Sequence, residues 1–365
     1  MVSLDAFRGL TIAGMILVNN PGSWSNVYPP LLHAPWHGWT PTDLIFPFFL
    51  FIVGVAIPFS FAKRLDRGDS RRDLWAHVLK RSVLIVAIGL FMAGFPNFDL
   101  SAIRFPGVLQ RIGVVYLFAA FAYLFLGTRG RIAVAGVLLL GYWGLMTLVP
   151  VPGFGTGDLS PDGNLAAYLD RLLMDGHLWS QSRTWDPEGL LSSLPAVATA
   201  LLGIATGEWL RSDRARPVKA RGLLIVGVAA VVTGSAWHVW FPINKNLWTS
   251  SYVVFTAGAA LWALAACYWV IDVRGRRTWS RPFVVYGRNA LAVFVASGLL
   301  AKMLVRTQVG RPDGSAVSLY TWIYETMFLP WASPVNASLA FALATILFWW
   351  VALWLLDRKK IYIKV

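Results

Sequence analysis

Residues 43–62 read DLIFPFFLFIVGVAIPFSFA, a run in which Asp43 and Ser60 are the only polar side chains. An α-helix needs about 20 predominantly apolar residues to cross the hydrocarbon core of a bilayer. This stretch therefore predicts a transmembrane helix.

Nine further apolar stretches of roughly this length accompany it. They cover residues 6–20, 82–96, 106–126, 132–149, 189–210, 222–241, 248–271, 282–303 and 337–356. With 57% hydrophobic and only 14% charged residues, the 365-residue chain has too few polar side chains for an ordinary soluble surface. The sequence predicts an all-α polytopic membrane protein of about ten helices, organised as one domain over 1–365.

The formal charge of +14 lies mainly in alternate loops. Lys and Arg gather at residues 63–81, 129–131, 211–221, 274–281 and 358–364. Short loops rich in Lys and Arg face the cytosol, which predicts that both termini are cytosolic. Orientation and anionic headgroups account for these cations, so no nucleic-acid partner is expected. The longer segments 21–42, 150–188 and 304–335 fall on the opposite side as irregular loops.

The single cysteine, Cys267, permits neither an intramolecular disulfide nor a cysteine-rich zinc site. The first apolar stretch lacks a small-residue cleavage site, which favours a retained first helix over a signal peptide. His33 and His37 are four residues apart, but Pro35 argues against a helix that would hold both on one face. No metal is expected.

Polar side chains inside apolar spans are costly and are therefore functional candidates. Asn19 and Asn20 close the first span, where they can line a cavity or, equally, form an interhelical hydrogen bond or a helix cap. Thr42 or Asp43 is a natural N-cap for the second span. Gln110 and Arg111 lie inside the fourth. Arg111 there needs a carboxylate, a phosphate or a water-filled cavity, and the candidate protein partners on that side are Asp43, Asp99 and Glu188.

A second group of polar residues lies towards the predicted cytosolic side. Arg8 marks the inner end of the first span, and Arg288 and Asn289 lie about two turns into the ninth. An Arg guanidinium suits phosphate, so these residues can form a cationic vestibule. For Arg8, snorkelling towards lipid headgroups is the alternative.

Several of these stretches together resemble the heparan-α-glucosaminide N-acetyltransferase family and its bacterial relatives. They are SLDAFRGL at 3–10, HAPWHGWTPTDLIFPFFLFIVG at 33–54, GVLQRIGV at 107–114, DPEGLL at 186–191 and PINKNLWTSSYV at 242–253. The resemblance implies transfer of acetyl from cytosolic acetyl-CoA to the amine of a glucosamine-type sugar on the far side of the membrane. It also implies that His33 is the catalytic histidine, with Asn19 a neighbouring active-site residue and Asp43 the acid of the TxxDL stretch.

The large amino-terminal extension of the animal enzymes is absent from this sequence. We therefore expect a bacterial relative in the inner membrane, with an acceptor that need not be heparan. Relatives in the family suggest a homodimer. The bilayer, acetyl-CoA and an amino sugar are the expected partners.

The chemistry explains the residue types, because an ammonium must lose a proton before it attacks a thioester. Histidine is suited to accept that proton at physiological pH. We expect His33 to be the general base, Asn19 a donor to the developing oxyanion and Asp43 the orienting acid. An acetyl-imidazole intermediate on His33 is the competing scheme.

Depth in the membrane assigns the remaining candidates. Arg8, Arg288 and Asn289 are expected at the phosphates of the co-substrate, and Gln110 and Arg111 nearer to the acetyl group. The expected acceptor-binding residues are Glu188, Asn244, Lys245 and Asn246.

Two other functions fit the same residues. An enzyme that acylates hydroxyls of a cell-envelope polysaccharide would use the same histidine and thioester. A sugar transporter would also carry buried Asn, Arg and Asp along a pore, although no inverted repeat is evident.

Overall fold

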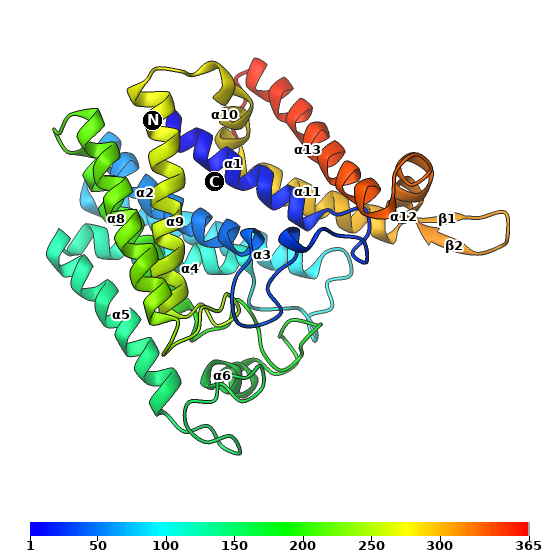
Figure 1. Ribbon diagram of the computed structural model, residues 1–365, viewed down its shortest axis with the longest axis horizontal. Helices are drawn as coiled ribbons and strands as arrows, with labels where there is room; N and C mark the ends of the chain where they lie inside the picture. The colour runs from blue at the N-terminus through cyan, green and yellow to red at the C-terminus, as the bar shows by residue number, and fades with distance from the viewer. Residues whose placement is uncertain (364–365) are drawn as a thin grey trace. The chain divides into compact units, whose positions relative to one another are not determined.

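The computed structural model describes residues 1–363 and is almost entirely helical (Figure 1). Lys364, one of the tail cations counted above, lies outside the described residues. The α-helices are α1 Val2–Asn19, α2 Ile45–Leu65, α3 Arg71–Gly94, α4 Val108–Phe125, α5 Thr128–Leu148, α6 Leu165–Met174, α7 Ser193–Arg211, α8 Arg216–Trp237, α9 Ser250–Tyr268, α10 Arg281–Arg288, α11 Ala290–Arg306, α12 Leu319–Ile323 and α13 Pro334–Arg358.

Short elements complete the described chain. They are the 3-10 helices η1 Pro29–Leu31, η2 Pro41–Leu44 and η4 Thr278–Ser280, the π-helices η3 Trp269–Val273 and η5 Tyr324–Phe328, and the antiparallel strands β1 Gln308–Gly310 and β2 Ala316–Ser318. Within residues 1–363, nine helices are long and apolar enough to cross a membrane, or ten if the bent pair α10 and α11 counts as one span. The predicted all-α polytopic class is confirmed.

The chain separates into two compact units. Unit 1 contains residues 1–34, 40–46 and the described residues from 270 onward, and unit 2 contains residues 35–39 and 47–269. The single domain expected from the sequence stays a prediction.

In unit 1, α1 packs directly against α10. Glycine allows this close approach on both helices: a Cβ on Gly9 would lie 1.7 Å from the carbonyl oxygen of Phe283, and one on Gly287 would lie 2.0 Å from that of Asp5. Small residues let helix backbones meet closely in membranes. This contact brings the amino-terminal half of α1 beside the end of α10.

The ninth predicted span is broken in the structure. Helix α10 ends at Arg288, α11 begins at Ala290, and the two are bent by 70°. Gly287 is a weak helix former, and the side chain of Asn289 bonds the carboxyl-terminal segment, so neither residue favours continuation of the helix. The continuous helix expected over 282–303 is therefore wrong.

In unit 2, α2 and α7 meet through glycines in the same way. A Cβ on Gly54 would lie 2.0 Å from the carbonyl oxygen of Ala200, and one on Gly203 would lie 2.2 Å from that of Phe51. The pairs α8 with α9, α3 with α4 and α5 with α7 also pack side by side, and α8 beside α9 is visible in Figure 1.

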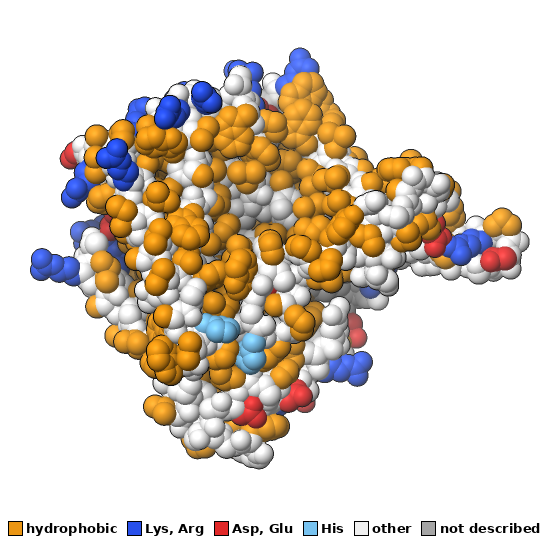
Figure 2. Space-filling model, in the orientation of Figure 1, with side chains coloured by type: hydrophobic (Ala, Val, Ile, Leu, Met, Phe, Trp, Pro, Cys, Tyr) orange, Lys and Arg blue, Asp and Glu red, His pale blue; other side chains and the backbone are white. Residues whose placement is uncertain are grey.

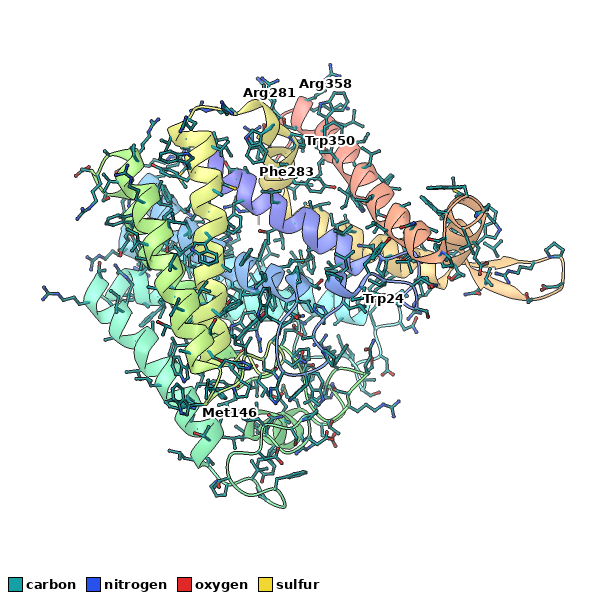
Figure 3. All side chains as sticks on the ribbon, viewed as in Figure 1. Trp24, Met146, Arg281, Phe283, Trp350 and Arg358 are labelled. Atoms are coloured by element: carbon teal, nitrogen blue, oxygen red, sulfur yellow. The ribbon has the colours of Figure 1, made fainter. Side chains whose placement is uncertain are left out.

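Large hydrophobic side chains are exposed along most helices, as expected where lipid rather than water is the neighbour. Figure 2 shows hydrophobic side chains spread over the visible face. In α8, for example, Leu224, Ile225, Val228 and Val232 are each about half exposed or more. Figure 3 shows Arg281, at the start of α10, and Arg358, at the end of α13, on the same side of unit 1, where these two helices are in contact.

Two further expectations differ from the structure. Helix α3 begins at Arg71 instead of residue 82, because Ser70 and Asp73 form a capping box upstream of the apolar run. The segments expected to be irregular contain ordered elements, namely α6 within 150–188 and the strands β1 and β2, α12 and η5 within 304–335.

Candidate functional site

His33 and Asp43 of unit 1 form a close pair. Nδ1 of His33 lies 2.6 Å from Oδ1 of Asp43. The side chain of Asp43 is 1% exposed, whereas that of His33 is 51% exposed. A buried carboxylate thus orients an imidazole that remains accessible, which is the usual arrangement of a positioned acid–base histidine.

Backbone and hydroxyl groups hold Asp43 in place. Its Oδ2 accepts hydrogen bonds from the amides of Ala34 and Thr40, both at 3.0 Å, and from the hydroxyl of Thr40 at 3.2 Å. Thr40 is the N-cap of η2 and Asp43 its third residue, with Pro41 at the first position. The expectation that Thr42 or Asp43 is the N-cap is wrong, because the 3-10 turn starts at Pro41 and so places the cap at Thr40.

The two asparagines at the end of α1 differ in exposure. Asn19 is an exposed residue at the end of α1, whereas Asn20 is buried and donates to the carbonyl of Ile16 at 2.9 Å. The proposed role of Asn19 at the oxyanion stays a prediction.

The predicted cationic vestibule maps to the contact between α1 and α10. Arg8 Nη1 lies 3.2 Å from Asp5 Oδ1 and 3.4 Å from the carbonyl oxygen of Gly287. Arg288 pairs with Asp357 at 2.8 Å and lies over the ring of Tyr362. The structure thus brings Arg8 close to the end of α10 and gives both guanidiniums a carboxylate partner.

Asn289 is tied to the carboxyl-terminal segment. It is 1% exposed, its Oδ1 accepts from the amide of Ile363 at 2.8 Å, and its Nδ2 donates to the carbonyl of Ile361 at 3.4 Å. These bonds hold the side chain of Asn289 at the break between α10 and α11, and its expected role at the phosphates stays a prediction.

In unit 2, Arg111 is almost fully buried inside α4. Its Nη2 donates to the carbonyl of Gly189 at 3.1 Å and to the hydroxyl of Ser192, and its guanidinium lies over the ring of Trp248. Nε and Nη1 have no hydrogen-bond partner in the described chain. Within the described residues, no carboxylate is a direct partner of Arg111, contrary to the expectation.

Gln110 packs against Gly89 and Gly107. A Cβ on either glycine would lie under 3 Å from Oε1 of Gln110.

Sequence reasoning missed the cation that pairs with Glu188. Arg104 Nη2 lies 2.6 Å from Oε2 of Glu188, while its Nε lies 2.7 Å from Oδ2 of Asp186. The side chain of Asp186 is fully buried and that of Glu188 nearly so. Asp186 stands in the recognised DPEGLL stretch, which is the signal that would have indicated it.

Asp170 is a second residue that the sequence did not indicate. It is buried on α6, and its Oδ1 accepts from the amide of Leu190 at 3.0 Å. A Cβ on Gly189 would lie 2.0 Å from its carboxylate. Burial raises the pKa of Asp170 to about 6, and the nearby Asp186 adds to the rise.

The loop before α9 carries the predicted acceptor residues. Asn244 is fully buried, and its Nδ2 lies 3.3 Å from Nδ1 of His37. Lys245 and Asn246 are partly exposed, and the carbonyl of Lys245 accepts from the amide of Trp248.

Among residues 1–363 no cluster of three His, Cys, Asp or Glu side chains forms a candidate metal site.

A family model described as the catalytic part of heparan-α-glucosaminide N-acetyltransferase matches residues 1–222. The human heparan-α-glucosaminide N-acetyltransferase is 33% identical over an alignment that covers 80% of this chain and 52% of the human protein. The mouse protein of the same name is 32% identical, covering 81% of this chain and 53% of its own length. The chain thus spans about half the length of the curated relatives it matches.

Proposed function

We propose that this chain, which belongs to the heparan-α-glucosaminide N-acetyltransferase family, is a transmembrane acetyltransferase that uses His33 as its general base. The co-substrate in this proposal is acetyl-CoA on the cytosolic side. The acceptor is the amine of a glucosamine-type sugar on the opposite side. A bacterial inner membrane and a homodimer belong to the same proposal.

One observation carries the assignment of the base. The carboxylate of Asp43 already accepts backbone and hydroxyl hydrogen bonds, so its contact with His33 is best made by a proton on Nδ1. In the neutral imidazole, the lone pair is then on Nε2. That nitrogen belongs to an exposed ring, as a base for an external amine requires.

The proposed reaction needs only two reactants, the amine and the thioester of acetyl-CoA, with His33 as the proton carrier. The neutral amine attacks the thioester carbonyl carbon, a C–N bond forms, and Nε2 of His33 takes the amine proton. The C–S bond then breaks, and the imidazolium returns the proton to the departing CoA thiolate. Asp43 stabilises the imidazolium and keeps the ring in one orientation.

Two clusters support the assignment of the acetyl-CoA contacts. Arg8 contacts the carbonyl of Gly287 at the end of α10, and Arg288 and Asn289 follow Gly287 in the chain. A phosphate there would compete with Asp5 and Asp357 for the guanidiniums. Gln110 and Arg111 are proposed for the acyl end. The two unpartnered nitrogens of Arg111 support this, because buried N–H groups require an acceptor such as a carbonyl oxygen.

The acceptor contacts are proposed for Glu188, Asn244, Lys245 and Asn246. Glu188 supplies a carboxylate that suits an ammonium group, although Arg104 currently holds it. Asn244 is positioned by three hydrogen bonds of its own loop.

Reconstituted vesicles provide the test. Acetyl-CoA labelled in its acetyl group is supplied outside, glucosamine is enclosed, and N-acetylated product is measured inside. We expect labelled N-acetylglucosamine from the parental protein and none from His33→Ala. Labelled product on hydroxyls but not on amines would support the O-acyltransferase alternative. Movement of labelled glucosamine without consumption of acetyl-CoA would support the transporter and contradict the proposal.

A further inference from the structure

His37 is a second histidine with a defined environment that the proposed mechanism does not use. It lies in residues 35–39 of unit 2, and its ring is exposed. Nδ1 of His37 faces Nδ2 of Asn244 at 3.3 Å, a residue 207 positions later in the chain. The neighbouring Gly38 donates its amide to the carbonyl of Ile243 at 2.8 Å, which fastens this loop to the loop of Asn244.

The orientation of the Asn244 amide is fixed by its other partner. Its Oδ1 accepts a hydrogen bond from the backbone amide of Leu247 at 2.9 Å. A backbone N–H can only donate, so the atom facing Leu247 must be the oxygen and the atom facing His37 must be the NH₂ group. The backbone amide of Asn244 also donates to the hydroxyl of Thr249, so the residue is held at both ends.

An NH₂ group beside Nδ1 determines the tautomer of His37. The amide can only donate, so Nδ1 must accept and the proton of the neutral ring lies on Nε2. Partial desolvation of the ring lowers the pKa of His37, and the nearby His238 lowers it further. His238 itself accepts the amide of Ile243 on Nδ1 at 2.9 Å. His37 is therefore a neutral hydrogen-bond donor, the opposite of the arrangement that Asp43 imposes on His33.

Indole rings lie beside this donor. Trp36 meets the ring of His37 edge to face, with centroids 6.2 Å apart, and meets Trp185 in the same way at 5.0 Å. The indole N–H of Trp36 donates to the carbonyl of Leu159 at 2.8 Å, which fixes the ring. Both indoles are partly exposed. A fixed donor next to partly exposed aromatic surface matches a sugar, which offers oxygen acceptors and apolar C–H faces.

We propose that His37 is an acceptor-binding residue that donates its Nε2–H to a hydroxyl or ring oxygen of the sugar, with Asn244 as the positioning residue that sets its tautomer. The proposal rests on the proposed function only for the nature of the acceptor. Because Nε2 carries a proton, His37 cannot take the proton of the reacting amine.

The tautomer can be measured without any enzymatic assay. The protein is labelled with ¹⁵N-histidine and reconstituted in lipid, and the nitrogen shifts of His37 are assigned by difference from His37→Gln. We expect a protonated Nε2 and an unprotonated Nδ1. In Asn244→Asp the carboxylate accepts from Nδ1–H, so the proton should move to Nδ1. A parental ring protonated on Nδ1 would overturn the proposal.

Binding and kinetics test the role of that proton. A Gln amide nitrogen can replace Nε2 of histidine, whereas an Asn amide replaces Nδ1. We expect His37→Asn to weaken glucosamine binding and raise the KM for glucosamine by about threefold to tenfold, the loss of one hydrogen bond. The KM for acetyl-CoA should stay within about twofold, and His37→Gln should recover most of the loss.

Glucosamine binding is measured by calorimetry without acetyl-CoA, so it is independent of acetyl transfer. Binding that depends on His37 in a protein that transfers no acetyl group would contradict the proposed function alone. Glucosamine binding that is absent from the parental protein, or equal in the parental protein, His37→Asn and His37→Gln, would overturn the proposal for His37.

Discussion

The carboxylate of Asp43 is buried and the imidazole of His33 that it contacts at 2.6 Å is half exposed. Loss of the acid should therefore leave an accessible ring without its orienting partner. We expect Asp43→Asn to lower kcat by about 10²-fold to 10⁴-fold, the range of positioned acid–base catalysis. His33→Ala should lower it at least as much. His77→Gln, on α3, is the matched histidine control and should keep the parental rate. An Asp43→Asn protein of parental kcat would contradict the role of this pair.

Substitutions in the ion pair between Arg288 and Asp357 can distinguish a binding role of Arg288 from a structural one. If Arg288 binds the phosphates of acetyl-CoA, Asp357 competes for the same guanidinium. We expect Arg288→Ala to weaken acetyl-CoA binding about tenfold and Asp357→Asn to strengthen it about twofold to fivefold. Calorimetric titration of both variants checks this, and equal affinities in both would remove Arg288 from the binding site.

Arg104 neutralises two nearly buried carboxylates, Asp186 and Glu188. Removing the cation leaves both acids without their partner. We expect Arg104→Gln to destabilise the protein by about 2–4 kcal/mol, below the full range for buried pairs because Arg104 is partly exposed. Thermal unfolding in detergent is the measurement, with exposed Arg129→Gln as the control. Adding Asp186→Asn should recover part of the loss, and an additive double variant would argue against the pairing.

Asp170 predicts a pH dependence of stability. Its pKa rises from 3.8 to about 6 on folding, so the folded state binds the proton more tightly than the unfolded state. The free energy of unfolding should therefore decrease as the pH rises from about 4 through 6, and then level off. Asp170→Asn should flatten this slope, whereas Asp175→Asn, an exposed neighbour, should keep it. Unfolding midpoints measured from pH 4.5 to 7.5 test the prediction. An unchanged slope in Asp170→Asn would contradict it.

Helix packing in unit 2 depends on Gly54, whose Cβ position is 2.0 Å from the carbonyl oxygen of Ala200. We expect Gly54→Val to cost about 3 kcal/mol or more, because backbone atoms cannot move as side chains can. Gly136 on α5 has open space at its Cβ position, so Gly136→Ala should be neutral or slightly stabilising. Expression level and detergent unfolding of the two variants give the comparison.

Local sequence patterns predicted most of the membrane-spanning helices and two of the candidate site residues. The apolar stretches identified nearly every span within a few residues, and the Pro- and Trp-rich segment with its family resemblance indicated both His33 and Asp43. Hydropathy did not show the break at Asn289, since residues on both sides are apolar. The start of α3 at Arg71 was missed because its first turns are charged.

Transfer of a helix into lipid depends on the residues of that helix alone, so the sequence by itself determined the all-α class and the approximate spans. Pairing between distant loops depends on where the folded chain carries them. Only the tertiary structure therefore showed that Arg104 pairs with Asp186 and Glu188, and that the amide of Asn244 faces Nδ1 of His37. Each of these contacts joins segments more than 80 residues apart, and no local pattern records them.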